Sequence, residues 1–130
     1  MSRTIVQDIT MPAKPSEVFQ ALNNPSRFSQ LTGGKKAEIG SEAGSHFSLF
    51  DGMITGLLVE AIPNQRLVQV WRAGNWPDGV YSLVSFNFQA NDDGTAIHFE
   101  QHGHPADAQE HLEAGWHKMY WQPLTAYLTG

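Results

Sequence analysis

The C-terminal part of the sequence constrains the fold most, because residues 107–128 run without a cluster of turn-forming residues. Apolar side chains recur there at intervals of three and four residues, which is the spacing of one helical face. They are Leu112, Trp116, Met119, Tyr120, Pro123, Leu124 and Tyr127. The pattern predicts a terminal helix over these 22 residues, about 33 Å long. Pro123 lies inside the pattern and predicts a kink near Met119.

The middle of the sequence predicts short strands. Glycines and clusters of Asp, Asn and Pro divide it into six extended segments. These are residues 35–39, 45–50, 53–62, 65–73, 80–90 and 95–102. Their short connections indicate an antiparallel meander. Apolar and polar residues alternate in the last two segments, so one sheet face is expected to be buried. Its expected inward residues are Val84, Phe86, Phe88, Ile97, Phe99 and Gln101.

The N-terminal part completes the predicted order of elements. A strand over residues 4–10 is followed by a helix starting near Pro15 and by one or two helical turns over residues 25–31. The fold class is therefore α+β, with a curved antiparallel sheet of about six or seven strands around a long C-terminal helix. This is the helix-grip arrangement, and it commonly leaves a cavity between sheet and helix. Residues 1–130 are expected to form a single domain.

Composition excludes several classes of protein and site. The chain has no cysteine, which excludes disulfides, thiolate zinc sites and cysteine nucleophiles. The net charge is −5 and Lys35-Lys36 is the one adjacent basic pair, so no nucleic-acid partner is expected. The sequence has neither a signal-like apolar region nor a run of about 20 apolar residues, so no membrane insertion is expected. A cytoplasmic location is the resulting expectation.

Motifs for catalysis, metals and cofactors are missing from the sequence. Six histidines occur without the spacing of a metal-binding helix motif, so no metal is expected. No nucleophile elbow and no glycine-rich phosphate-binding loop is present, so no cofactor is expected. No Asp, Glu or His is expected to point inward. The amide side chain of Gln101 is expected to point inward, where it needs a hydrogen-bond partner. That partner is expected to be the Gly103 loop, Tyr120 or a polar group of a ligand.

Four separated blocks of the sequence carry a family resemblance. The blocks are Asp51–Gly56, then Trp71-Arg72 with Trp76-Pro77 and residues 79–82, then Gln101–Pro105, and finally Gly115–Trp121. In this order they resemble the motifs of the activator-of-heat-shock-protein-90-ATPase homologue (Aha-type) family, over roughly residues 12–128. The resemblance implies a START-like, Bet v-like fold of the SRPBCC superfamily, which includes lipid carriers, hormone receptors and polyketide cyclases. It also implies an Hsp90-type chaperone as a partner.

The leading functional hypothesis is a non-enzymatic domain that binds a small apolar or aromatic ligand, or associates with a chaperone. The residues expected to line its cavity are Phe47, Trp71, Phe86, Phe88, Ile97, Phe99, Gln101, Trp116, Met119 and Tyr120. No catalytic residue is assigned. A polyketide-cyclase-like enzyme using the same cavity is one alternative, and a protein-interaction module without a ligand is another. A cavity filled by Trp116, Met119 and Phe88 would favour the interaction module.

Overall fold

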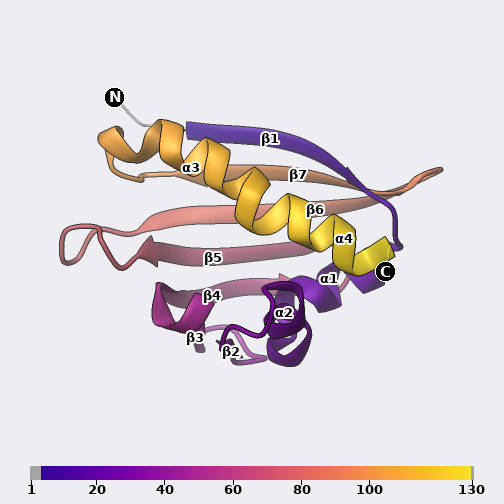
Figure 1. Cartoon of the computed structure of the whole chain (residues 1–130), viewed down its shortest axis with the longest axis horizontal. Helices are drawn as coiled ribbons and strands as arrows, with labels where there is room; N and C mark the ends of the chain where they lie inside the picture. The colour runs from indigo at the N-terminus through magenta and orange to yellow at the C-terminus, as the bar shows by residue number, and fades with distance from the viewer. Residues whose placement is uncertain (1–3, 130) are drawn as a thin grey trace.

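The computed structural model describes residues 4–129, where a seven-stranded antiparallel sheet lies against a long terminal helix (Figure 1). In chain order the elements are β1 (Thr4–Met11), α1 (Pro15–Asn23), α2 (Pro25–Leu31), β2 (Glu38–Ile39), β3 (His46–Leu49), η1 (Phe50–Gly52), β4 (Ile54–Ile62), β5 (Arg66–Ala73), β6 (Ser82–Asn91), β7 (Gly94–His102), η2 (Ala106–Ala108), α3 (Gln109–Gly115), η3 (Trp116–Trp121) and α4 (Gln122–Thr129). Across the sheet the order is β1-β7-β6-β5-β4-β3-β2. The predicted helix-grip fold and its order of elements are confirmed.

The two short helices form where prolines and a capping residue favour them. Pro15 and Pro25 occupy first-turn positions, where the missing N–H costs nothing. The Asn24 side chain caps α2 by accepting a hydrogen bond from the Arg27 N–H at 3.1 Å. Both helices contact α4, and α1 also contacts β6 and β7. They therefore close one end of the space between the sheet and the terminal helix (Figure 1).

The terminal helix contains a π-helical segment, η3, where a kink was predicted. The Gln122 N–H donates to the His117 carbonyl five residues earlier, which is the π pattern. The segment ends just before Pro123, whose ring would collide with the Met119 carbonyl in a continuous α-helix. The wider turn places Trp121 on the buried side and leaves Met119 37% exposed. The prediction that Met119 faces the sheet is therefore wrong, because it assumed α-helical spacing.

The sheet has one buried and one exposed face, as the alternation in β6 and β7 predicted. All six expected inward residues are buried. Strand β4 approaches β5 so closely at Gly56 that a Cβ there would lie 1.8 Å from the Val70 carbonyl oxygen. Only glycine fits this position, which accounts for the last residue of the first sequence block.

Candidate functional site

Residues from the separated sequence blocks meet in one hydrogen-bonded network under the terminal helix. The Gln101 Nε2 group donates to Ser82 Oγ at 3.0 Å, and Ser82 Oγ donates to the Trp71 carbonyl at 2.8 Å. From the helix, the Trp116 Nε1 group donates to Gln101 Oε1 at 2.8 Å. Gln101 is fully buried, and both ends of its amide are paired inside the protein.

The two partners expected for Gln101 within the protein were therefore wrong. Neither the Gly103 loop nor Tyr120 hydrogen-bonds its side chain; Ser82 and Trp116 do. Strand alternation predicts the face on which a side chain lies, but it contains no information on which residue of a distant element reaches it. The amide consequently orients the indole of Trp116 rather than standing free toward a ligand.

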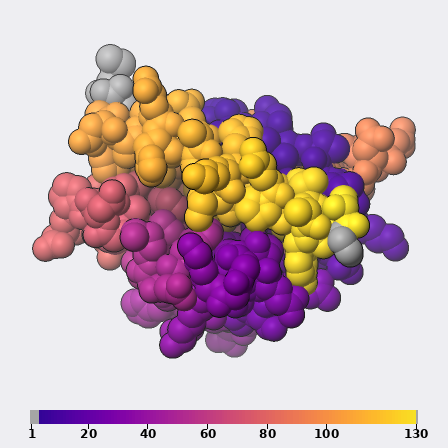
Figure 2. All heavy atoms as spheres, viewed as in Figure 1, coloured from indigo at the N-terminus to yellow at the C-terminus, as the bar shows by residue number. Residues whose placement is uncertain are grey.

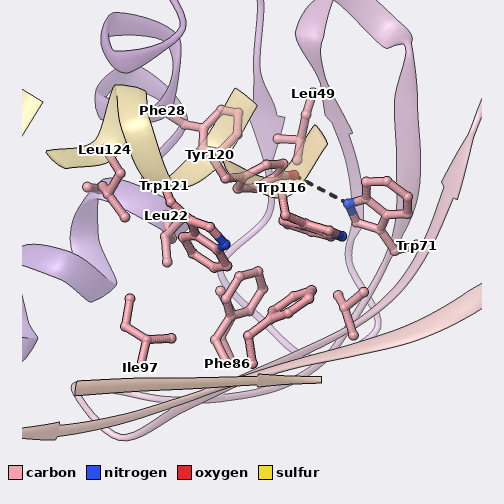
Figure 3. Close-up of a cluster of buried hydrophobic side chains, with 14 of the residues drawn as sticks. Leu22, Phe28, Leu49, Trp71, Phe86, Ile97, Trp116, Tyr120, Trp121 and Leu124 are labelled. Atoms are coloured by element: carbon pink, nitrogen blue, oxygen red, sulfur yellow. Dashed lines mark hydrogen bonds between the residues drawn. The ribbon is translucent and has the colours of Figure 1, made fainter. Parts of the chain in front are cut away.

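Aromatic rings continue the network between sheet and helix (Figure 3). The Trp71 Nε1 group donates to the Tyr120 hydroxyl at 3.3 Å. Burial raises the pKa of the Tyr120 hydroxyl far above its ordinary value, so the phenol stays neutral. The Trp116 ring centroid lies 4.2 Å from that of Tyr120, 4.3 Å from that of Phe99 and 5.2 Å from that of Trp71. These separations are those of rings in direct contact.

The structure brings together nine of the ten residues that were expected to line a cavity. The buried nine are Phe47, Trp71, Phe86, Phe88, Ile97, Phe99, Gln101, Trp116 and Tyr120, and only Met119 points away. Ring contacts run without a break from Trp76 through Trp71, Trp116, Phe99 and Phe86 to Phe88. The side chains therefore contact one another across the space where a helix-grip protein would hold a ligand.

The loop between β5 and β6 is held by Arg72. Its guanidinium donates to the carbonyls of Trp76, Pro77 and Val80 at 2.9–3.1 Å. The same group lies 5.6 Å from the centroid of the Tyr81 ring. Trp76 is buried against Trp71, with ring centroids 5.6 Å apart. The second sequence block therefore builds a loop with a fixed shape.

A left-handed turn precedes β4. Phe50 and Asp51 have φ values of 54° and 57°, which are unusual for residues with side chains, and Gly52 has a φ of 95°. Asp51 exchanges hydrogen bonds with Lys36: its carboxylate accepts from the Lys36 N–H at 2.6 Å, and its own N–H donates to the Lys36 carbonyl at 3.1 Å. The Phe50 ring packs on Phe28 and Tyr120. These contacts hold a strained backbone.

Two hollows open at the surface of the protein. One, of about 550 Å³, is lined by Phe50, Asp51, Gly52, Met53, Gly74 and Asn75. The other, of about 740 Å³, lies between α1, α2 and the end of α4 and is lined by Ala13, Glu17, Asn24, Ser26, Arg27, Gln30, Tyr127 and Leu128. Sequence reasoning missed both; the Asp-Gly dipeptide indicated a turn, but not its strain or the hollow beside it.

The exposed face of β7 carries a row of charged residues. His98 Nδ1 lies 2.7 Å from an Asp8 oxygen, and its Nε2 lies 2.8 Å from a Glu100 oxygen. His102 Nε2 lies 2.8 Å from the other Glu100 oxygen. Hydrogen bonds to Asp8 and Glu100 raise the pKa of His98, and bonds to His98 and His102 lower the pKa of Glu100. Among residues 4–129 no group of three or more His, Asp or Glu side chains is arranged to hold a metal ion.

His104 was not foreseen as an inward residue. It is buried, its Nε2 is hydrogen-bonded to Gln109 Oε1, and its Nδ1 atom is buried without a partner in the described structure. The expectation that no histidine points inward is therefore wrong for this residue. It follows directly after the turn residue Gly103, where strand alternation no longer determines the direction of a side chain.

Comparisons with known proteins agree with this architecture. The family model described as Activator of Hsp90 ATPase homolog 1-like protein matches residues 12–129. Activator of 90 kDa heat shock protein ATPase homolog 2 from mouse is 30% identical over 71% of this chain and 28% of its own length. The corresponding Dictyostelium discoideum activator homolog is 34% identical over 81% of this chain and 27% of its own length. The chain thus spans less than a third of these relatives.

A solved structure shares the fold over almost the whole chain. The crystal structure of an HSP90 activator from Plasmodium falciparum superposes with a TM-score of 0.87, covering 99% of this chain and 96% of that one. The two sequences are 24% identical, so the likeness concerns the fold. Within the part of the chain that is described, no helix combines the length and apolar character needed to cross a membrane.

Proposed function

The chain belongs to the family of Activator of Hsp90 ATPase homolog 1-like proteins, and from that premise we propose that it is a non-enzymatic interaction domain that binds an Hsp90-type chaperone. Such a partner also favours a cytoplasmic location. Because the chain matches only about a third or less of the length of its curated relatives, we propose binding to the chaperone as its core activity and place stimulation of the chaperone ATPase second.

One observation carries the choice between a partner protein and a small ligand. The rings that would line a ligand cavity are in contact with one another, and the one inward amide, Gln101, is bonded to Ser82 and Trp116. A ligand would have to separate these rings and replace both hydrogen bonds of the amide. Breaking buried hydrogen bonds of this kind costs about 1–3 kcal/mol for each unpaired group. This cost favours a packed core that supports an outer binding surface.

The same observation disfavours a polyketide-cyclase-like enzyme. Such an enzyme places an acid or a base beside its substrate. The buried polar side chains in the described residues are Gln69, Ser82, Thr95, Gln101 and His104. Of these, His104 carries the one side chain of an acid–base type, and it lies in the loop after β7 rather than among the rings. Gln101 and Ser82 are occupied with each other.

The proposal is tested by measuring binding of the chain to a full-length Hsp90-type chaperone by calorimetry, and then the ATPase rate of that chaperone with the chain added. We expect saturable binding with or without a rise in ATPase rate. An Hsp70-type chaperone serves as the control and is expected not to bind. Failure to bind the Hsp90-type chaperone would contradict the proposal.

The ligand alternative has its own test. Tryptophan fluorescence and melting temperature are recorded with fatty acids, flavonoids and aromatic polyketides, since Trp71 and Trp116 lie where such a ligand would enter. We expect no saturable change in either quantity. A compound that shifts both would restore the ligand-binding hypothesis, and turnover of that compound would restore the enzyme.

A further inference from the structure

We propose that the hollow between the η1 turn and the start of the β5–β6 loop is the point at which a protein partner docks, by inserting an apolar side chain that is flanked by basic residues. This inference rests on the proposed function and assigns a surface to it. Two chain segments form the hollow, residues 50–53 and residues 74–75, and its volume is about 550 Å³. In Figure 2 the magenta atoms near residue 50 lie beside the rose atoms of the β5–β6 loop.

The lip of the hollow is an exposed methionine. Met53 is 55% exposed, although it stands between a buried turn residue and a buried strand residue, Phe50 and Ile54. A Cβ at Gly74 would lie 3.7 Å from the Met53 sulfur, so the thioether lies over a position without a side chain. Methionine is flexible and polarizable, and exposed methionines are common on surfaces that accept apolar partners. The part of the hollow formed by Met53 and Gly74 is therefore suited to an apolar side chain.

Both walls are fixed before any partner arrives. On one side the left-handed turn is held by the paired hydrogen bonds between Asp51 and Lys36 and by the packing of the Phe50 ring. On the other side Arg72 holds the loop through three carbonyls. A surface that needs no ordering loses less entropy on binding. Strained backbone that a fold maintains at such a place is typical of binding sites.

The shape and the charge of the hollow indicate its occupant. It is open to the surface, whereas sites for small molecules enclose most of the ligand, so a side chain presented by a protein fits better than a free molecule. Asp51 lines the hollow and no Lys or Arg does, and Asp78 belongs to the same β5–β6 loop. The nearby Lys36, whose backbone is bonded to Asp51, pairs its ammonium group with Glu38 at 3.0 Å. With a net charge of −5 on the chain, complementarity favours basic residues around the apolar anchor of the partner.

The test compares two lysine substitutions at equally exposed apolar residues. Met53→Lys places a positive charge on the lip, where it removes the apolar contact and repels a basic partner. Val6→Lys is the matched control, since Val6 is 53% exposed and lies on β1, on the outer face of the sheet. Affinity for a full-length Hsp90-type chaperone is measured by calorimetry, and melting temperatures establish that both variants fold.

We expect Met53→Lys to weaken binding about tenfold or more, as loss of an apolar anchor contact does, and Val6→Lys to leave affinity within about twofold. Asp78→Asn should lower the affinity less and make it less sensitive to salt. If the wild-type chain binds and Met53→Lys binds equally well, or if both lysine variants weaken binding alike, the docking surface is wrong while the proposed function stands. If the wild-type chain does not bind, the proposed function itself fails and this inference with it.

Discussion

The two faces of strand β7 differ completely although they alternate along the same nine residues. Ile97, Phe99 and Gln101 face the terminal helix, where water is excluded and the Gln101 amide is paired at both ends. His98 and Glu100 face outward and are joined to each other by a short hydrogen bond in contact with solvent. The inner hydrogen bonds are neutral and buried, whereas the outer ones join ionisable groups that water can also satisfy.

The charge of a hydrogen-bonded pair is therefore a poor guide to how much the pair stabilises this protein. A buried neutral amide that loses its partner has no water to replace it, so the penalty is large. An exposed ion pair that is broken is solvated at once, so the penalty is small. The predictions below test this ranking, from the inner face to the outer face.

Trp116→Ala is expected to have the largest effect. It removes a ring packed on Phe99 and Tyr120 and deprives Gln101 of its donor, which should lower the free energy of unfolding by about 3–5 kcal/mol. Met119→Ala, on the exposed side of the same π-helical segment, is the control and should change the free energy of unfolding by no more than about 0.5 kcal/mol. Urea denaturation measures both; equal effects would mean that the helix faces are assigned wrongly.

Gln101→Leu is expected to come second. The substitution keeps an apolar side chain on the inner face but leaves the Trp116 N–H without an acceptor, at a cost of about 1–3 kcal/mol. Gln89→Leu, at an exposed position of β6, is the matched control. The midpoint of urea denaturation should fall for Gln101→Leu with an unchanged slope. A midpoint equal to that of the wild type would show that the buried network contributes nothing.

His98→Gln is expected to have a small effect that depends on pH. Hydrogen bonds to Asp8 and Glu100 raise the pKa of His98 above its ordinary value of 6.5. The stabilisation that these hydrogen bonds give the folded protein is therefore fully present below that pH and is lost as pH rises through the raised pKa. The free energy of unfolding of the wild type should therefore exceed that of the variant by less than about 1 kcal/mol near pH 6. Near pH 9 the difference in free energy should be smaller still. A difference that grows toward alkaline pH would contradict the assigned charge on the imidazole.

Metal removal is expected to have no effect. Treatment with a chelator should leave the melting temperature unchanged, because hydrogen bonds to Asp8, Glu100 and Thr4 already occupy the ring nitrogens of His98 and His102. A reproducible drop in melting temperature on chelation would contradict this. Single alanine substitutions of His98, His102 and His104 would then identify the ligands.

Patterns along one segment predicted the fold well, because periodicity depends only on which side of a segment meets water. The alternation around Phe86 and Phe99 gave the buried face of the sheet, and the spacing around Trp116 gave the terminal helix. Met119 was misplaced because a π-helical turn adds a residue to the helix face, and nothing in a three-and-four spacing distinguishes it from an α-helical turn.

The candidate site could be predicted only in part, because its parts depend on contacts between distant segments. The inward direction of Gln101 followed from alternation, but its partners come from β6 and from the terminal helix. The left-handed conformation of Asp51 depends on the backbone of Lys36, which lies 15 residues earlier in the chain. The burial of His104 follows a turn that ends the alternation. The spacing of residues along the sequence contains no information on these contacts between distant segments.

The pairing of β1 with β7 has a consequence for how the chain folds. It joins Thr4 to His102, 98 residues apart, whereas each strand from β3 to β6 pairs with the next one across a turn or, between β5 and β6, the loop of residues 74–81. Loop-closure entropy therefore delays β1 until the meander has formed, and folding in milliseconds to seconds is expected.

Ile5→Ala should then speed unfolding and leave the refolding rate nearly unchanged, whereas a substitution at Phe86 should slow refolding. During synthesis β1 leaves the ribosome before the other six strands, so its buried residues Ile5 and Met11 stay without a partner strand until β7 has been made.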